Sequence, residues 1–167
     1  EEALAEQLFD EQVAFMEQAA AKESTGKTVA FFHISSSGNA VARKSGDYVT
    51  KMIQLAGGDY VFSDLGDPDS ALGTVNLEME AFYQGAKDAD YIFYNSVIGG
   101  ELASLAELLE KSPLLADFKA VQNGNVWCTG KNFYQETTQL GLMVSEISTI
   151  LADEDEANPP RMFYKLQ

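Results

Sequence analysis

The sequence has few of the side chains that catalysis and metal binding use most. Its 167 residues include one cysteine, Cys128, and one histidine, His33. A single cysteine excludes an internal disulfide and a cysteine-based zinc site, and a single histidine excludes a multi-histidine metal site. Cys128 lies in the apolar run NVWCTG, which predicts a small buried side chain rather than a nucleophile. We therefore expect no metal site and no cofactor.

Basic residues and long apolar runs are also scarce. Eleven lysines and arginines stand against 26 aspartates and glutamates, a net charge of −15. Such a surface repels phosphate backbones and anionic lipid headgroups, so we expect no nucleic-acid partner. No stretch approaches the roughly 18 to 20 apolar residues that a membrane-spanning helix needs.

Three motifs typical of enzymes are missing as well. The chain has no G-x-x-x-x-G-K-[ST] phosphate loop, no G-x-G-x-x-G dinucleotide motif and no G-x-S-x-G nucleophile elbow. A non-catalytic protein is therefore favoured. A Rossmann-like enzyme domain that binds a nucleotide or another small molecule stays as the alternative.

Helical and strand patterns alternate along the chain. Residues 1–24 are rich in alanine, glutamate and glutamine and predict one long helix, while apolar runs predict strands at 28–34, 59–65, 90–95 and 125–130. Helical spacing of apolar residues fills the segments between them, and Asp47 is suited to cap the first of these helices. The pattern predicts an α/β fold, a mostly parallel sheet of about four strands flanked by helices.

Ligands of such sheets bind at the carboxyl ends of the strands. The first segment there is HISSSGNAVARKSGD, which we interpret as a polar ligand-binding loop. Ser36, Ser37 and Asn39 are candidates to hydrogen-bond a ligand, and Arg43 to pair with a carboxylate or another oxygen anion. A solvated loop with a surface arginine is an equal alternative. His33 is a candidate base or axial metal ligand, although a hydrogen-bonded structural histidine is favoured.

The later loops at the same edge supply further candidates. Asn95 begins the loop after the third strand, and Phe133 and Tyr134 lie between the fourth strand and the last helix. Exposed aromatic side chains there would form a wall for a large or flat ligand. The acidic loop with Asp64, Asp67 and Asp69 lacks the spacing of an EF-hand, so a turn is favoured over a calcium site.

The order of these segments carries a resemblance to a known family. A long helix leads into KTVAFFHIS, followed by GDYVTKMIQLAGGDYVF, LEMEAFYQGAKDADYIFYN, LLADFKAVQNGNVW and an amphipathic helix. This order resembles the C-terminal half of the substrate-binding proteins of ABC importers for iron-siderophores, haem and cobalamin. The resemblance implies two α/β lobes joined by a rigid helix, with the ligand in the cleft between them. Residues 1–26 would be the linking helix and 27–167 the C-terminal lobe, with the N-terminal lobe absent from this chain.

The resemblance also implies a ligand, a partner and a location. The ligand would be an iron chelate, either a ferric siderophore or a haem-like compound, and Arg43 somewhat favours a siderophore with an anionic chelate. The partner would be an ABC permease, docked through an exposed glutamate that corresponds to Glu80 or the neighbouring Glu78. The protein would be extracytoplasmic, either periplasmic or lipid-anchored on the outer face of a bacterial cell membrane.

Overall fold

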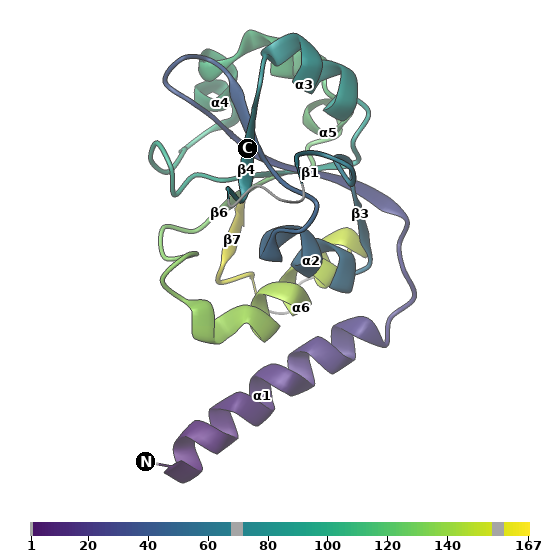
Figure 1. The fold of residues 1–167 in the computed structure, drawn as a ribbon, viewed down its shortest axis with the longest axis vertical. Helices are drawn as coiled ribbons and strands as arrows, with labels where there is room; N and C mark the ends of the chain where they lie inside the picture. Colours follow the sequence, from purple (N-terminus) through teal and green to yellow (C-terminus); the bar gives the residue numbers. More distant parts are fainter. Residues whose placement is uncertain (1, 68–71, 155–158) are drawn as a thin grey trace.

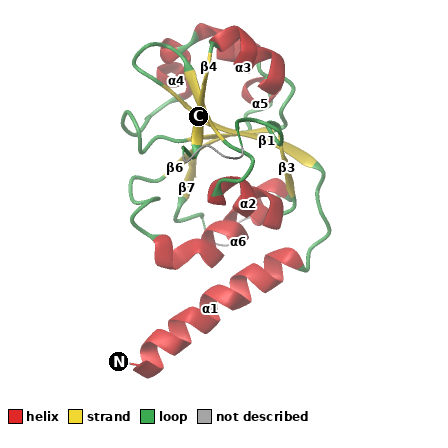
Figure 2. Cartoon of the chain, viewed as in Figure 1, coloured by secondary structure: helices red, strands yellow, loops and turns green. Residues whose placement is uncertain are grey.

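A computed structural model describes residues 2–67, 72–154 and 159–167. A mixed seven-stranded sheet forms its centre, with β1 central in the order β4-β2-β1-β5-β6-β7 and β3 also paired with β1 (Figures 1 and 2). The strands are β1 (Lys27–Ile34), β2 (Ala40–Arg43), β3 (Gly58–Tyr60), β4 (Thr74–Leu77), β5 (Tyr91–Tyr94), β6 (Val126–Thr129) and β7 (Phe163–Lys165).

Helices cover both faces of the sheet. Figure 1 shows α2 and α6 on one face and α3, α4 and α5 on the other. The α-helices are α1 (Glu2–Ala20), α2 (Tyr48–Leu55), α3 (Met79–Ala86), α4 (Leu105–Lys111), α5 (Lys119–Gln122) and α6 (Leu140–Leu151), and two 3₁₀ turns are η1 (Pro113–Asp117) and η2 (Thr137–Gln139). The α/β fold with a leading long helix is confirmed.

The parallel part of the sheet is the part that the apolar runs predicted. Strands β3 and β5 pair with β1 in parallel, and β6 pairs with β5 in parallel. The antiparallel strands β2, β4 and β7 were not expected. The predicted strand at 59–65 is shorter than expected. Strand β3 pairs with one edge of β1 only as far as Val29, and β2 pairs with the same edge from Phe32 onward.

Alternation along β1 divides the core into two layers. Val29 and Phe31 face α2 and α6, whereas Ala30 and Phe32 face α3, η1 and α5. A strand buried on both faces has no polar side to alternate with, which is why its centre, VAFF, is continuously apolar. Cys128 is fully buried in β6, as predicted, and burial raises the pKa of its thiol to about 12.

Helix α1 runs along the outside of α6 (Figure 1). The Gln12 side chain accepts a hydrogen bond from the Leu142 N–H at 3.1 Å. Of the residues of α1, Ala19 alone is buried, so most of the helix surface is open. Within the described residues, no helix combines the length and the hydropathy needed to cross a bilayer.

Residues 33–43 form a β-hairpin rather than the loop that we expected, and residues 44–47 lead from it into α2. Ile34 pairs with Ala40 and His33 with Val41, so the turn is confined to residues 35–39. Strand β4 then pairs with the outer edge of β2. Alanines at 40 and 42 fill the buried side of β2, and their small side chains hid the strand pattern in the sequence.

Candidate functional site

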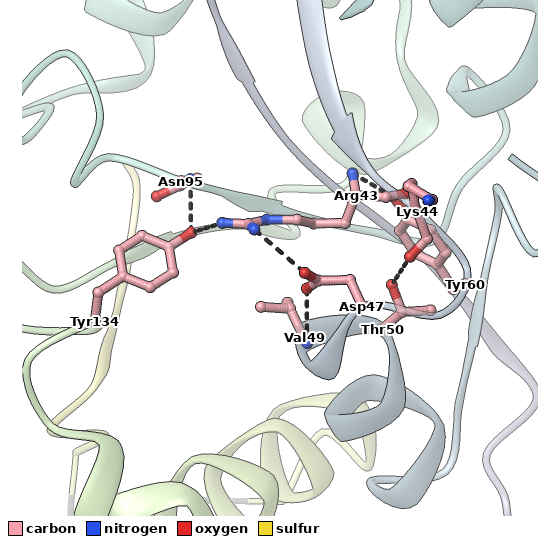
Figure 3. Close-up of polar contacts among 8 residues, drawn as sticks. All are labelled: Arg43, Lys44, Asp47, Val49, Thr50, Tyr60, Asn95 and Tyr134. Carbon is pink, nitrogen blue, oxygen red and sulfur yellow. Dashed lines mark hydrogen bonds and ion pairs between the residues drawn. The ribbon is translucent and has the colours of Figure 1, made fainter. Parts of the chain in front are cut away.

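The candidate site lies beside the carboxyl ends of the parallel strands β5 and β6, which the side chain of Arg43 reaches from the antiparallel strand β2. Arg43 is the last residue of β2, Asn95 follows β5, and Tyr134 lies in the segment between β6 and α6. Arg43 Nη2 donates to the Tyr134 hydroxyl, and Asn95 Nδ2 donates to the same oxygen at 2.9 Å (Figure 3). The Tyr134 hydroxyl thus joins three predicted ligand-binding residues from three segments.

Asp47 balances the charge of Arg43. Its Oδ2 lies 3.4 Å from Arg43 Nη1, and the two side chains are 9% and 14% exposed. Its Oδ1 accepts from the Val49 N–H at 2.9 Å and caps α2, as the sequence predicted (Figure 3). The carboxylate therefore joins the first turn of α2 to the guanidinium. Arg43 is an ion-pair partner in this structure, not the solvated surface arginine of the alternative.

Tyr60 fixes the backbone of Arg43. Its hydroxyl accepts from the Arg43 N–H at 3.0 Å and donates to the Arg43 carbonyl at 2.8 Å (Figure 3). Burial raises the pKa of Tyr60 above its ordinary value, so the phenol stays protonated. One residue further, the Lys44 carbonyl accepts from Thr50 Oγ1 at 2.9 Å. The main chain that carries the Arg43 side chain is therefore held by hydrogen bonds from β3 and α2.

Tyr134 and Asn95 form the second half of the cluster. The Tyr134 hydroxyl accepts two hydrogen bonds, and burial raises the pKa of this phenol against the opposing effect of Arg43. Asn95 is 1% exposed, and its main-chain N–H donates to the Phe32 carbonyl at 2.8 Å. No donor among the described residues reaches Asn95 Oδ1. The cluster thus keeps an unused hydrogen-bond acceptor.

The other residues of the predicted loop lie away from this cluster. Ser36 and Ser37 are exposed in the hairpin turn, where Ser37 Oγ lies 2.9 Å from Ser35 Oγ. Asn39 Nδ2 donates to Glu78 Oε1 at 3.4 Å. At about 3.3 Å of rise per strand residue, the turn is roughly 10 Å from Arg43. The structure therefore divides the predicted loop residues into two groups.

His33 is a buried strand residue. It is 8% exposed near the end of β1. Burial, followed by the charge of Arg43, lowers the pKa of its imidazole. The ring is therefore neutral near pH 7, as expected for a structural histidine.

Phe133 is not the exposed aromatic that we predicted. It is 2% exposed, and its ring centroid lies 6.2 Å from that of Phe31 and 5.6 Å from that of Phe163. Phe163 belongs to β7, a strand that the sequence analysis missed. Because β7 closes the sheet beside this loop, Phe133 is part of the core and Tyr134 alone of the pair reaches the polar cluster.

Glu78 and Glu80 lie at the start of α3, and both are exposed. Glu78 is in the N-cap position, although its side chain makes no capping hydrogen bond. Glu80 lies in the first turn, where a carboxylate complements the helix dipole.

Two exposed apolar side chains at this edge escaped the sequence analysis. Tyr48, 41% exposed, follows Asp47 at the start of α2. Its pKa is raised above the ordinary value, because partial burial and Tyr134 outweigh the opposing effect of Arg43. Ile98, 45% exposed, lies in the loop that follows β5. The position of Tyr48 directly after the helix-capping Asp47 could have indicated an exposed aromatic side chain.

The acidic loop with Asp64, Asp67 and Asp69 is described only in part, since Asp69 lies outside the described residues. Within the described part of the chain, no three His, Cys, Asp or Glu side chains form a group that could hold a metal ion.

A relative of known sequence is an uncharacterised lipoprotein of Methanocaldococcus jannaschii. The two are 34% identical over 117 residues, which cover 66% of this chain and 25% of that protein. The chain therefore spans about a quarter of its curated relative.

Solved structures resemble the chain over most of its length. The TroA-like periplasmic binding protein FepB from Veillonella parvula has a TM-score of 0.71 at 12% identity, covering 99% of this chain and 56% of that one. A siderophore periplasmic binding protein of Thermobifida fusca has a TM-score of 0.61 at 20% identity, with coverages of 90% and 53%. The periplasmic haem-binding protein HutB of Vibrio cholerae has a TM-score of 0.61 at 20% identity, with coverages of 83% and 51%.

These likenesses agree on the fold, and the chain spans about half of each of the three structures. A family profile described as periplasmic binding protein matches residues 1–132. The chain belongs to the periplasmic binding protein family and is extracytoplasmic.

Proposed function

We propose that the chain is one lobe of the solute-binding component of an ABC importer. It captures an iron chelate, either a ferric siderophore or a haem-like ligand, and delivers it to the permease. The observation that carries this proposal is the cluster of Arg43, Tyr134 and Asn95 at the carboxyl edge of the sheet. This is the edge at which open α/β sheets bind ligands.

The similar structures support the ligand class. One is a siderophore-binding protein and another a haem-binding protein. The exposed Tyr48 and Ile98 add apolar surface beside the polar cluster, which suits a large ligand with both polar and apolar parts.

We further propose that residues 1–26 are the linking helix and that a second α/β lobe completes the cleft. Residues of α1, of η2 and of the start of α6 line a largely apolar groove of about 430 Å³, and they include Leu8, Phe9 and Leu140. Leu8 and Phe9 are exposed here, and burial of such a patch is favourable. The preceding lobe would cover this groove.

The permease would dock at the start of α3. Glu80 is exposed there and is placed to meet an arginine of the permease, and Glu78 lies two residues before it at the N-cap. In the full-length protein, Glu80→Ala or Glu80→Arg should slow uptake and leave ligand affinity unchanged. Unchanged uptake in both variants, and in Glu78→Ala, would remove this assignment.

Thermal denaturation of the full-length protein with added ligands tests the function directly. A ferric siderophore or haem should raise the melting temperature, because a ligand that binds the folded state stabilises it. Arg43→Gln and Tyr134→Phe should reduce the shift, whereas Lys51→Gln, on the exposed side of α2, should not. If neither siderophores, haem nor cobalamin raise the melting temperature, the proposal fails.

A further inference from the structure

The charge of the polar cluster restricts the ligand that it accepts. Arg43 is the cation of the cluster, and it already holds the Asp47 carboxylate at 3.4 Å with both side chains largely buried. A ligand anion would have to compete with this carboxylate for the same guanidinium. The ion pair is neutral as a whole, so it provides no net attraction for an anion.

Besides the Arg43–Asp47 pair, one lysine, one histidine and one glutamate lie near the cluster. Lys44 is a basic residue with a buried side chain, and its Cγ lies close to Gly66. Burial keeps His33 neutral near pH 7. Glu78 adds a negative charge at the tip of the hairpin beside Asn39. The chain as a whole carries −15.

What the cluster offers instead is neutral hydrogen bonding. The Tyr134 oxygen accepts from both Arg43 and Asn95, so its own proton is available to a ligand acceptor. Asn95 Oδ1 is buried and has no donor among the described residues, so a ligand donor that reached it would complete its hydrogen bonding. A buried polar atom without a partner is costly, so a ligand group that bonds it gains affinity.

We propose that this lobe selects an iron chelate without net negative charge, such as a neutral ferric tris-hydroxamate, and discriminates against trianionic ferric tris-catecholates. This inference rests on the proposed function and deepens it. Asp47 is the residue that determines the specificity, because its carboxylate neutralises Arg43. The anionic chelate that Arg43 alone suggested in the sequence is thereby disfavoured.

Asp47→Asn is a sharp test, because asparagine also caps helices well. The amide oxygen can keep the hydrogen bond from the Val49 N–H, while the charge on the Arg43 side is lost. Asp59→Asn is the matched control, since Asp59 is exposed in β3 and pairs with Thr28 near the start of β1, at the opposite end of the sheet.

The experiment measures dissociation constants of the full-length protein for a neutral ferric tris-hydroxamate and a trianionic ferric tris-catecholate at low ionic strength. The neutral chelate should bind at least tenfold more tightly. Asp47→Asn should tighten catecholate binding about three- to tenfold, the size expected from removing one nearby charge, and change hydroxamate binding less than twofold. Asp59→Asn should change neither.

A catecholate that binds the unchanged protein as tightly as the hydroxamate overturns the charge selection and leaves the proposed function standing. The same holds if Asp47→Asn does not strengthen catecholate binding. Binding of neither chelate, together with no binding of haem or cobalamin, overturns the proposed function itself and this inference with it.

Discussion

The Tyr60 hydroxyl bonds both main-chain groups of Arg43, accepting from its N–H at 3.0 Å and donating to its carbonyl at 2.8 Å. Tyr60 ends β3 and Arg43 ends β2, and both strands pair with β1 rather than with each other. The Tyr60 side chain therefore supplies the hydrogen bonds between them. Strand β2 pairs with β4 on its other edge, where Arg43 faces Thr74.

Tyr60→Phe should therefore weaken both the fold and the site. Loss of the hydroxyl leaves a backbone donor and acceptor without their partner, which costs about 1–3 kcal/mol of unfolding free energy. Ligand affinity should fall as well, because the guanidinium loses its fixed backbone. Urea denaturation and ligand titration measure the two effects.

Tyr83→Phe is the control for this prediction. Tyr83 is also partly buried, and its hydroxyl makes no hydrogen bond within the described residues. Its replacement should change neither quantity appreciably. Equal effects in the two variants would contradict the role given to Tyr60.

Asp90 ties the start of β1 to α5 at the other end of the sheet. Its Oδ2 accepts from the Thr28 N–H at 2.9 Å, and its Oδ1 lies 2.7 Å from Lys119 Nζ. Burial alone would raise the pKa of Asp90, but the hydrogen bonds from Lys119 and Thr28 outweigh it and lower the pKa to about 2.

This lowered pKa predicts a pH dependence of stability. A carboxylate with a lower pKa in the folded than in the unfolded state stabilises above the unfolded value, near 3.9, and the stabilisation is lost as the pH falls toward 2. The difference in unfolding free energy between the unchanged protein and Asp90→Asn should be about 1–2 kcal/mol at pH 6 and shrink between pH 4 and pH 2. A difference that stays constant over this range would contradict the assignment.

The sequence predicted the parallel centre of the sheet because its strands are buried on both faces. The centres of their apolar runs, VAFF and YIFY, are without charged residues or alternation, and the helices between them show regular apolar spacing. Strand β2 was missed because its inward residues, Ala40 and Ala42, are too small to mark a strand, and β7 because it is only three residues long.

The site was predictable only in its residue types. Arg43, Tyr134 and Asn95 were singled out because each follows a strand that ends at one edge of the sheet. The pairing of Arg43 with Asp47 was not, because Asp47 was recognised only as a helix cap. Capping uses one carboxylate oxygen, and the sequence gives no sign of what the second oxygen contacts.

Phe133 and Tyr134 should separate stability from binding. Phe133→Ala removes a ring packed between Phe31 and Phe163, and such core deletions cost about 3–5 kcal/mol. Tyr134→Phe removes only the hydroxyl that contacts Arg43 and Asn95. We expect the first change to lower the melting temperature strongly. The second should lower it less, because it leaves the Arg43 and Asn95 donors without their acceptor, and it should weaken ligand binding. Thermal denaturation and ligand titration of both variants measure the two effects. A larger loss of affinity in Phe133→Ala than in Tyr134→Phe, without a large fall in melting temperature, would contradict this assignment.

Helix α1 depends on a close backbone approach to α6. A methyl group added at Gly141, in the first turn of α6, would overlap the Gln12 carbonyl oxygen and carbon of α1. Backbone atoms cannot move aside as a flexible side chain can, so Gly141→Ala should push α1 off α6 and break the hydrogen bond from the Leu142 N–H to Gln12. Limited proteolysis should then cut α1 faster than in the unchanged protein.

Gly46→Ala provides the comparison for α1, because a methyl group at Gly46 meets open space. The lobe itself should survive the Gly141 change, since its two core layers lie between the sheet and its covering helices. We expect cleavage within residues 2–20 to accelerate in Gly141→Ala, and the remaining fragment, from β1 onward, to resist digestion. Equal cleavage rates in the two variants would contradict the role of the close backbone approach. Side-chain contacts would then hold α1 against α6, and Gln12→Ala should accelerate cleavage instead.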